Sequence, residues 1–482
     1  MTEPTFTGPE ACRMTAREAV GVLKAGEVSP TELLEASWAR MDQVEPEVNA
    51  TVIRQDDRAR AALAALPERE AENSGHRGWL AGLPIGIKDL IAVKGMRATG
   101  GSPATADFVP DESDALVERL EARGGIIAGK TNTPEWGAGA NTFNAVFGRT
   151  RNPWNTARNA GGSSGGAAVS LATGEVWLSH GSDLAGSLRT PAAYCGVVGL
   201  RPSPGRCGGG PPAAAFSIEG IQGPMARNIG DLALFLDAMA GYDPSHPISL
   251  EEPGVGFQDA LDAVSGPIRI AFSEDQGGFA PVEPEIRAVM RQALEGIAGD
   301  DLVVEETCPE LPDLAETYVS LRGVHYGSVT DRLPDEIKAH FKDTLRKNAE
   351  FGRMLTSDAI YDAMRQRTVL YHIMRGFLTR FDVLAIPVVG LPPGPVEEEY
   401  PRVVDNVAQV DYIDWLKFSF LATTCALPAL SLPCGFTADG MPVGLQLVGP
   451  PRGEARLLQV AAEVERRFAL DMGPIDPVPA GL

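Results

Sequence analysis

The sequence predicts an α/β fold. From Leu83 to about Leu200, short apolar runs alternate with glycine-rich turns, as in chains whose strands and helices interleave. Strand-like runs return at Phe381–Ile386 and Ala429–Leu432, after a long helical stretch. The length of 482 residues alone would suggest about three domains. Because core-like strands recur beyond the helical stretch, we instead expect a single fold that the helices interrupt.

The first elements are expected to be helices, over residues 1–75. Thr15–Glu18 and Ser29–Glu32 are capping boxes, and Pro30 suits the first turn of the second helix. Further along the chain we expect buried strands at Ile85–Ile87 and Ile126–Ala128, a helix at Ser113–Arg123, amphipathic helices from about 300 to 380, and a final helix at Arg452–Phe468.

Composition argues against several classes of protein. The net charge of −22 repels nucleic-acid phosphates and anionic membrane surfaces. The acidic first ten residues lack the apolar segment of a secretory signal. The most apolar stretch, Phe418–Phe436, contains Pro428 and Pro433, so it predicts core strands and turns rather than a membrane helix. The six cysteines show no C-x-x-C pair and the six histidines no H-x-x-x-H pair, so we expect reduced thiols, no zinc site and a cytoplasmic protein.

One segment matches the phosphate-binding loop pattern. Gly124–Thr131 reads G-x-x-x-x-G-K-T, but its variable positions include Ile126, Ile127 and Ala128, which look like a strand. Pro134 follows where the phosphate-facing helix would have to begin. We therefore expect a buried strand that ends in a turn.

A second segment, Gly162–Gly166, matches the nucleophile elbow G-x-S-x-G. It would make Ser164 the nucleophile and needs a histidine later in the chain, such as His325 or His372. Neither histidine lies in a recognisable loop motif, so this remains an alternative.

Three segments are more informative together than alone. The first, Gly82–Asp89, places Lys88 at the end of an apolar strand. The second, Gly161–Gly166, is a glycine-rich turn before a helix of small residues, and the third, Gly181–Ala192, is another glycine turn that carries a serine. Each alone is typical of an ordinary turn or strand end, but together, in this order and spacing, they form a specific pattern.

With these segments in this order, the sequence resembles the amidase signature family, the Ser–Ser–Lys amide hydrolases. The resemblance covers most of the chain, because 427–435 and 440–449 look like the closing motifs of the family. By position it implies that Ser187 is the acylated nucleophile, Ser163 the bridging serine and Lys88 the base. It also implies a cis peptide before Ser163, at Gly162, and an oxyanion hole made by the backbone N–H groups of Leu184, Ala185, Gly186 and Ser187.

The chemistry explains these residue types. A serine hydroxyl is a poor nucleophile until a base takes its proton. A lysine can be that base only when neutral, and burial must lower its pKa from about 10.4 because desolvation disfavours the ammonium. Ser163 would then carry the proton between Lys88 and Ser187.

Ala185 departs from the commoner family pattern, in which two glycines precede the nucleophile. Its Cβ restricts φ and narrows the approach to the oxyanion hole, but its N–H can still donate, so we expect the hole to survive. Asp183 and Arg189 are expected to brace this loop, with a plain salt bridge as an equal alternative.

The lead interpretation is an amide hydrolase that forms an acyl-enzyme and releases an amine or ammonia. The same groups could cleave esters, carbamates or ureas. An alternative is the A subunit of a tRNA-dependent amidotransferase, which needs B and C partners and a cation for glutamine, such as Arg365, Arg367 or Arg375. An inactive binding protein is disfavoured because all three triad positions are filled.

The resemblance further implies one large α/β/α sandwich around a mixed β-sheet with peripheral helices, over 1–482. Within it we expect a signature core at 80–230, a helical insertion at about 300–380 that shapes the substrate pocket, and a returning core at 381–470. Aromatic residues of the insertion suggest room for an aryl or alkyl acyl group, although for any single one of them helix packing is the more common role: Tyr318, Tyr326, Phe351, Tyr361 and Tyr371. We expect no metal or organic cofactor and no nucleic-acid or membrane partner. The expected ligand is a small-molecule amide, with carbamate or ester as options, and a homodimer is left open.

Overall fold

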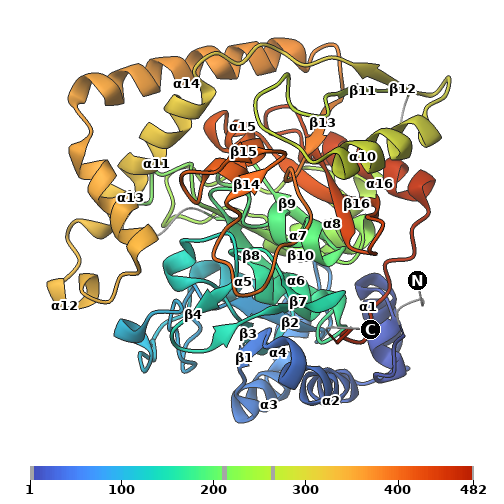
Figure 1. The fold of residues 1–482 in the computed structure, drawn as a ribbon. Coiled ribbons are helices and arrows are strands. Elements are labelled where there is room, and N and C mark those ends of the chain that lie inside the picture. The colour runs from blue at the N-terminus through green and yellow to red at the C-terminus, as the bar shows by residue number, and fades with distance from the viewer. Residues whose placement is uncertain (1–4, 209–213, 262–265, 480–482) are drawn as a thin grey trace.

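A mixed sheet of 11 strands forms the centre of the molecule (Figure 1). The computed structural model describes residues 5–208, 214–261 and 266–479. The strand order is β1-β3-β2-β8-β10-β9-β16-β17-β13-β11-β12. The strands are β1 (Thr51–Ile53), β2 (Pro84–Lys88), β3 (Ile126–Thr131), β8 (Leu178–Asp183), β9 (Val198–Arg201), β10 (Ile221–Ala226), β11 (Ile268–Phe272), β12 (Leu302–Glu306), β13 (Val383–Pro387), β16 (Ala429–Phe436) and β17 (Pro442–Val448). β2 is parallel to β3 and β8, β11 is parallel to β12 and β13, and the other neighbours are antiparallel.

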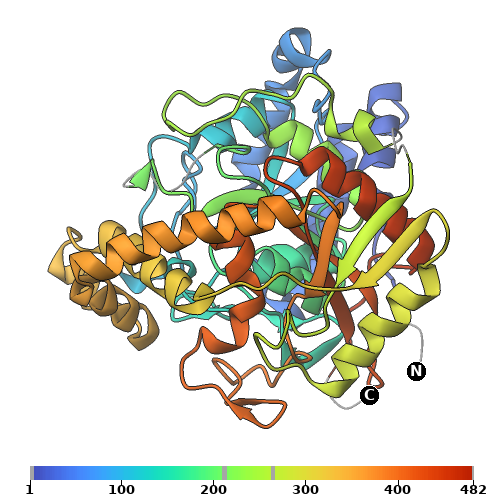
Figure 2. The same cartoon turned by 90° about the horizontal axis from the view of Figure 1, so that it is seen from above.

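Helices cover both faces of this sheet (Figures 1 and 2). Along β13, Val383 and Ala385 pack in one core cluster, whereas Leu384 and Ile386 pack in another. Because successive side chains of a strand point to opposite faces, this alternation shows a strand buried on both sides. The predicted α/β/α sandwich around a mixed sheet is therefore confirmed.

Two sets of helices supply the outer layers. One face packs against α1 (Ala16–Ala25), α5 (Ala115–Ala122), α8 (Ile229–Met239), α10 (Pro284–Ile297) and α16 (Glu454–Phe468). The other packs against α2 (Pro30–Val48), α3 (Asp56–Ala64), α6 (Gly165–Ala172) and α7 (Arg189–Cys195). The connections contain two short helices, α4 (Leu66–Asn73) and α9 (Phe257–Leu261). They also contain three two-stranded sheets: β4 (Phe143–Asn144) with β5 (Gly148–Arg149), β6 (Arg151–Asn152) with β7 (Asn155–Asn159), and β14 (Val403–Val404) with β15 (Val407–Ala408).

Local sequence signals set the first helices. The Thr15 hydroxyl accepts from the Glu18 N–H at 3.1 Å, and the Glu18 carboxylate accepts from the Thr15 N–H at 2.8 Å. Ser29 and Glu32 form the same reciprocal pair at the start of α2, with Pro30 as its first residue. Both predicted capping boxes are confirmed.

The helical insertion projects to one side of the sheet (Figure 2). It consists of α11 (Leu314–Thr330), α12 (Asp335–Lys338), α13 (Asp343–Met354) and α14 (Ser357–Phe377). Its expected start was wrong, because Leu302–Glu306 forms the edge strand β12, whose β-branched Val303 and Val304 suit a strand. The expectation of strands and turns over Phe418–Phe436 was also wrong in part, because α15 (Phe420–Thr424) forms there before β16 begins.

Two further properties concern only the described residues. Within them, no helix combines the length and the apolarity needed to cross a membrane. All six cysteines are free thiols there, and five of them are buried.

Candidate active site

Lys88 is the last residue of β2 and is wholly buried. Its Nζ lies 2.7 Å from Ser163 Oγ, 2.9 Å from Ser164 Oγ and 3.0 Å from Ser182 Oγ. Burial lowers the pKa of Lys88 to about 7, and the negative charge of Asp183 reverses this only in part. With hydroxyl groups as its partners, this lysine can be neutral near neutral pH.

The second segment runs from β7 into α6 and carries Ser163. The Gly162–Ser163 peptide is cis, as the resemblance implied. Gly161 has φ +70°, and a Cβ there would lie 3.0 Å from Pro191 Cα, so the turn needs a glycine at this position. The Ser164 N–H donates to the carbonyl of Ser187 at 3.1 Å, and this bond ties the second segment to the third.

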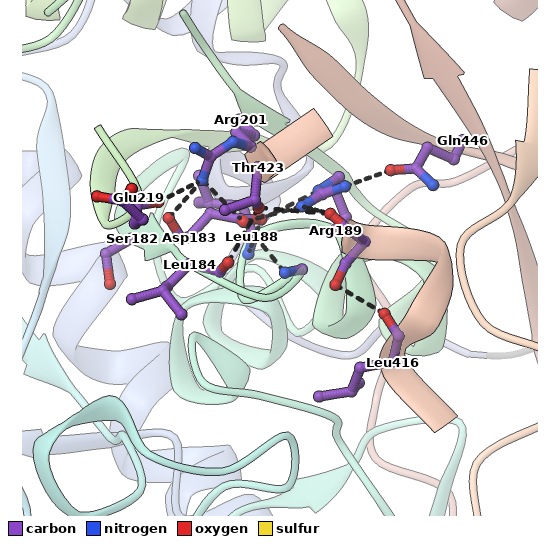
Figure 3. A network of polar contacts seen from close by, with 12 residues as sticks. Ser182, Asp183, Leu184, Leu188, Arg189, Arg201, Glu219, Leu416, Thr423 and Gln446 are labelled. Atoms are coloured by element: carbon purple, nitrogen blue, oxygen red, sulfur yellow. Dashed lines mark hydrogen bonds and ion pairs between the residues drawn. The ribbon is translucent and has the colours of Figure 1, made fainter. Parts of the chain in front are cut away.

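Asp183 organises the loop between β8 and α7. Its carboxylate accepts hydrogen bonds from the N–H groups of Gly186 and Leu188, each at 3.1 Å. Arg189 and Arg201 pair with the same carboxylate at 2.9 and 3.3 Å (Figure 3). Burial alone would raise the pKa of Asp183, but the two arginine charges outweigh it and hold that pKa well below its usual range. Asp183 and Arg189 therefore form more than a plain salt bridge, because the carboxylate also fixes the loop backbone.

The four expected oxyanion donors are not equivalent. The N–H of Gly186 is already bonded to Asp183, whereas among the hydrogen bonds of the described residues none uses the N–H of Leu184, Ala185 or Ser187. The peptide carbonyls that precede these three N–H groups are each held by a donor: Asp183 O by Arg201 at 2.7 Å, Leu184 O by Thr423 Oγ1 at 2.9 Å, and Gly186 O by the Thr190 N–H at 2.7 Å. In a planar trans peptide the N–H points away from the C=O, so all three N–H groups face away from these anchors.

The structure accommodates Ala185 without backbone strain. Ala185 does not have a positive φ, so its Cβ is compatible with the loop. Gly186, by contrast, has φ +85°, and a Cβ there would lie 3.0 Å from both Ser419 Cβ and Thr190 Oγ1. The loop therefore requires the second glycine and not the first.

The three serines that the sequence predicts as candidates for catalysis differ in access. Ser187 is 7% exposed, whereas Ser163 is 2% exposed and Ser164 is fully buried. Ser164 Oγ accepts from Lys88 and contacts the carbonyl of Ser182 at 3.3 Å. Within the described part of the chain, the Ser187 hydroxyl makes no hydrogen bond, including none to Ser163, so it is free to turn toward a partner.

The two competing motifs do not form the sites that they resemble. In the phosphate-loop match, Lys130 is buried within β3 and pairs with Asp89 at 2.6 Å, so it is not available to a phosphate. For the nucleophile elbow, His325 contacts Ser217 Oγ at 3.0 Å and His372 is exposed, and neither bonds to Ser164 in the residues that the structure describes.

Several residues at the site were not predicted. Ser182 precedes Asp183 on β8, and its contact with Lys88 follows from the parallel pairing of β2 with β8, which the sequence alone does not specify. Gln446 on β17 bonds to Arg189, and Thr423 reaches the loop from α15, a helix that was expected to be strand or turn (Figure 3).

Of the aromatic residues expected at the pocket, two lie near the loop. Tyr318 and Tyr326 are buried on α11, and Tyr318 OH lies 3.3 Å from Leu184 O. Phe351 and Tyr361 are 37% and 56% exposed, and Tyr371 is partly exposed.

Comparison with known proteins gives concordant matches. A sequence model of the amidase family matches residues 32–458. The chain is 35% identical to the A subunit of a glutamyl-tRNA(Gln) amidotransferase from Synechococcus sp. (strain CC9605), over 92% of this chain and 94% of that protein. It is 34% identical to an acylamidase of Rhodococcus erythropolis, over 94% of this chain and 95% of that protein. Among solved structures, a bacterial aryl acylamidase of the amidase signature family superposes with a TM-score of 0.86 and 28% identity, over 94% and 96% of the two chains.

Proposed function

The chain belongs to the amidase signature family, and from this premise we propose that it is an amide hydrolase with an acyl-enzyme on Ser187. The observation that carries the proposal is the buried Lys88, whose Nζ has the hydroxyls of three serines as partners and whose pKa burial lowers to about 7. A neutral lysine in this position is a base beside hydroxyl groups, which is the requirement for activating serine.

In the proposed acylation, neutral Lys88 accepts the proton of Ser163 while Ser163 accepts the proton of Ser187. The Ser187 oxygen attacks the amide carbonyl carbon, and the carbonyl oxygen becomes an oxyanion. A neutral amine donates two hydrogen bonds and accepts one, and three hydroxyl neighbours match that number. Ser163 has the shortest contact, 2.7 Å, and is the natural donor to the lone pair.

The oxyanion would be stabilised by the N–H groups of Leu184, Ala185 and Ser187. These groups are unpaired among the described residues, and the Gly186 N–H is not part of the proposed hole because Asp183 holds it. Such preorganised donors contribute strongly, since loss of one typically costs about 2.7–4 kcal/mol of barrier.

In the second half, the C–N bond breaks and Ser163 returns a proton from protonated Lys88 to the leaving amine. Water then attacks the acyl carbon, and the same relay takes its proton. The carboxylic acid leaves and the Ser187 hydroxyl is restored, so the reaction balances with the amide and one water as its only reactants.

For the acyl group we propose an aryl or alkyl chain. Tyr326 packs in an apolar cluster with Ala138, and the side chains of Trp136 and Leu184 lie against that cluster. Leu184 belongs to the loop between β8 and α7, residues 184–188, which we call the nucleophile loop, so an apolar acyl chain could lie on this side of Ser187. Carbamates and esters remain alternative substrates because the same groups could cleave them.

The second candidate is the A component of an amidotransferase, and the 35% identity to the Synechococcus protein favours it. Its glutamine would need a cation. Arg365 is largely exposed and pairs with Asp362, and Arg367 pairs with Glu219 at 2.6 Å, so neither charge is uncompensated. The remaining candidate, Arg375, is exposed. These surroundings favour the hydrolase.

The test is intact-mass spectrometry after treatment with a fluorophosphonate, on the wild type, Ser187→Ala and Ser164→Ala. Labelling lost in Ser187→Ala and retained in Ser164→Ala, together with hydrolysis of an anilide such as p-nitroacetanilide, supports the proposal. Labelling lost only in Ser164→Ala would establish the elbow instead. An unlabelled chain that co-purifies with partner proteins and releases ammonia from glutamine only with them would establish the amidotransferase.

A further inference from the structure

The peptide between Leu184 and Ala185 is held from outside the signature core. Its carbonyl, Leu184 O, accepts from Thr423 Oγ1 at 2.9 Å and from Tyr318 OH at 3.3 Å. Thr423 lies on α15 and Tyr318 on α11 of the helical insertion. The N–H on the other side of the same peptide is that of Ala185, which is unpaired among the described residues.

Tyr318 is itself held in one orientation. Its ring stacks on Phe420 with ring centroids 3.7 Å apart, and Arg322 Nη1 donates to its oxygen at 3.2 Å. Because that oxygen accepts from the arginine, its own proton is directed to Leu184 O. Burial raises the pKa of Tyr318, so the hydroxyl keeps this proton over the ordinary pH range.

Arg322 is buried, and residues other than Tyr318 also hold its guanidinium. Its Nε donates to Asn348 Oδ1 at 2.9 Å, and Nη2 donates to the hydroxyl of Tyr412. In the described residues none of its contacts is an ion pair with a carboxylate, so its hydrogen bonds are made to tyrosine and asparagine oxygens. The result is a continuous chain of donors from the insertion to the nucleophile loop.

We propose that Tyr318 and Thr423 are positioning residues of the oxyanion hole, which fix the Leu184 carbonyl so that the Ala185 N–H faces the substrate oxygen. The inference rests on the proposed function of Ser187. A planar trans peptide cannot turn its N–H without turning its C=O, so two hydroxyls on the carbonyl control the donor.

The other two anchored peptides do not depend on the insertion. Arg201 holds Asp183 O and the Thr190 N–H holds Gly186 O, and both anchors come from the signature core. Thr423 has a longer alternative contact, 3.4 Å to Ser419 O, so it can leave Leu184 O without becoming unpaired. Tyr318 and Thr423 therefore share the Leu184 carbonyl, and when one hydroxyl is removed the other still holds it.

The test compares Tyr318→Phe, Thr423→Val and the double variant with the wild type. Tyr318→Phe keeps the ring on Phe420 and removes only the hydroxyl. Tyr194→Phe is the matched control, because Tyr194 OH also contacts a loop carbonyl, Leu391 O, at 3.2 Å, but away from the nucleophile loop. Thermal unfolding by circular dichroism checks that each variant is folded.

Two rates are measured: phosphonylation of Ser187, in which its oxygen displaces fluoride from phosphorus, and hydrolysis of p-nitroacetanilide. Each single variant is expected to lower the phosphonylation rate about 3- to 10-fold, the effect of one hydrogen bond. The double variant is expected to lose about 100-fold, as for loss of an oxyanion donor. The loss falls on kcat with KM unchanged, and the pH midpoint of the rate stays at the wild-type value.

The outcomes separate this inference from the proposed function. A double variant that reacts as fast as the wild type, or no slower than Tyr194→Phe, overturns the inference alone. So does a rise in KM at constant kcat, because that would make Tyr318 a substrate contact. A wild-type chain that is not labelled at Ser187 overturns the proposed function, and the inference with it.

Discussion

The rate of Ser187 acylation is expected to rise about a hundredfold between pH 5 and pH 9, with its midpoint near pH 7. The base must be neutral, and burial lowers the pKa of Lys88 to about 7. At pH 5, two pH units below that value, about 1% of the lysine is neutral, and at pH 9 about 99% is neutral. The rate therefore falls as the pH falls through the pKa of Lys88 and is constant above it.

Neighbouring groups do not obscure this profile. His180 Nδ1 accepts from the Lys88 N–H, and burial, with the nearby lysine charge, lowers the pKa of His180 to about 3. Asp183 stays ionised because its pKa lies well below the usual range. Glu465 does titrate between pH 5 and pH 9, because burial raises its pKa to about 7. It accepts from the Ile229 N–H at the start of α8 and has no contact with Lys88, so Glu465→Gln is the control that should leave the midpoint unchanged.

The assay is the second-order rate of fluorophosphonate labelling of Ser187, followed by intact mass from pH 5 to 9. Wild type and Glu465→Gln should share one midpoint, and Lys88→Arg should show no rise because the guanidinium stays protonated. A midpoint above pH 9, or a flat profile, would refute the reasoning that burial makes Lys88 the base. A midpoint that moves in Glu465→Gln would show that Glu465, and not Lys88 alone, controls the rate.

Three further predictions concern the loop and the core. Gly186→Ala should lower kcat/KM for p-nitroacetanilide at least about 100-fold, because alanine rarely adopts the φ of +85° at this position and would distort the oxyanion loop. For Ala185→Gly, kcat/KM should stay within about threefold of the wild type. Asp183→Asn should lower the free energy of unfolding in urea by about 3–5 kcal/mol, because it leaves two buried arginines without their carboxylate; a loss below about 1 kcal/mol would contradict that role. Burial and the charge of Glu175 raise the pKa of Glu45 well above its usual value, so folding favours the protonated form and stability is lost as the pH rises through that pKa. Glu45→Gln mimics the protonated form, so the fall in Tm from pH 5.5 to pH 8 should be smaller than in the wild type; an equal fall would contradict the assignment.

The fold class and most elements could be predicted from the sequence because their signals are local. A capping box specifies a helix start within four residues, and an apolar run between glycine turns specifies a buried strand. The helix α15 was missed because its residues, Phe420–Thr424, are either apolar or β-branched threonines and are too few for a helical period. The edge strand β12 was missed because its strand signal, Val303 and Val304, is short and flanked by acidic residues, and its pairing with β11 is not visible in the sequence.

The residues of the site also divide into those with a local sequence signal and those without one. Lys88, Ser163 and Ser187 lie in glycine-rich segments whose spacing is visible in the sequence. The contacts of Thr423 and Tyr318 with Leu184 O join residues 239 and 134 positions apart, and no local pattern marks them. Only the packing of α11 and α15 on the nucleophile loop reveals them.

Two buried lysines on neighbouring strands show why Lys88 and not Lys130 can act as a base. Burial lowers the pKa of both, but Lys130 Nζ lies 2.6 Å from Asp89, so its charge is paired within the core. Asp89 follows Lys88 directly in the sequence, yet it serves the lysine of the next strand, because successive side chains at a strand end point to opposite faces. The carboxylate whose charge acts on Lys88, that of Asp183, is in turn paired with two arginines. Each acid near Lys88 is thus committed to another cation, and this leaves the lysine with serine hydroxyls as its partners and with a proton that it can lose.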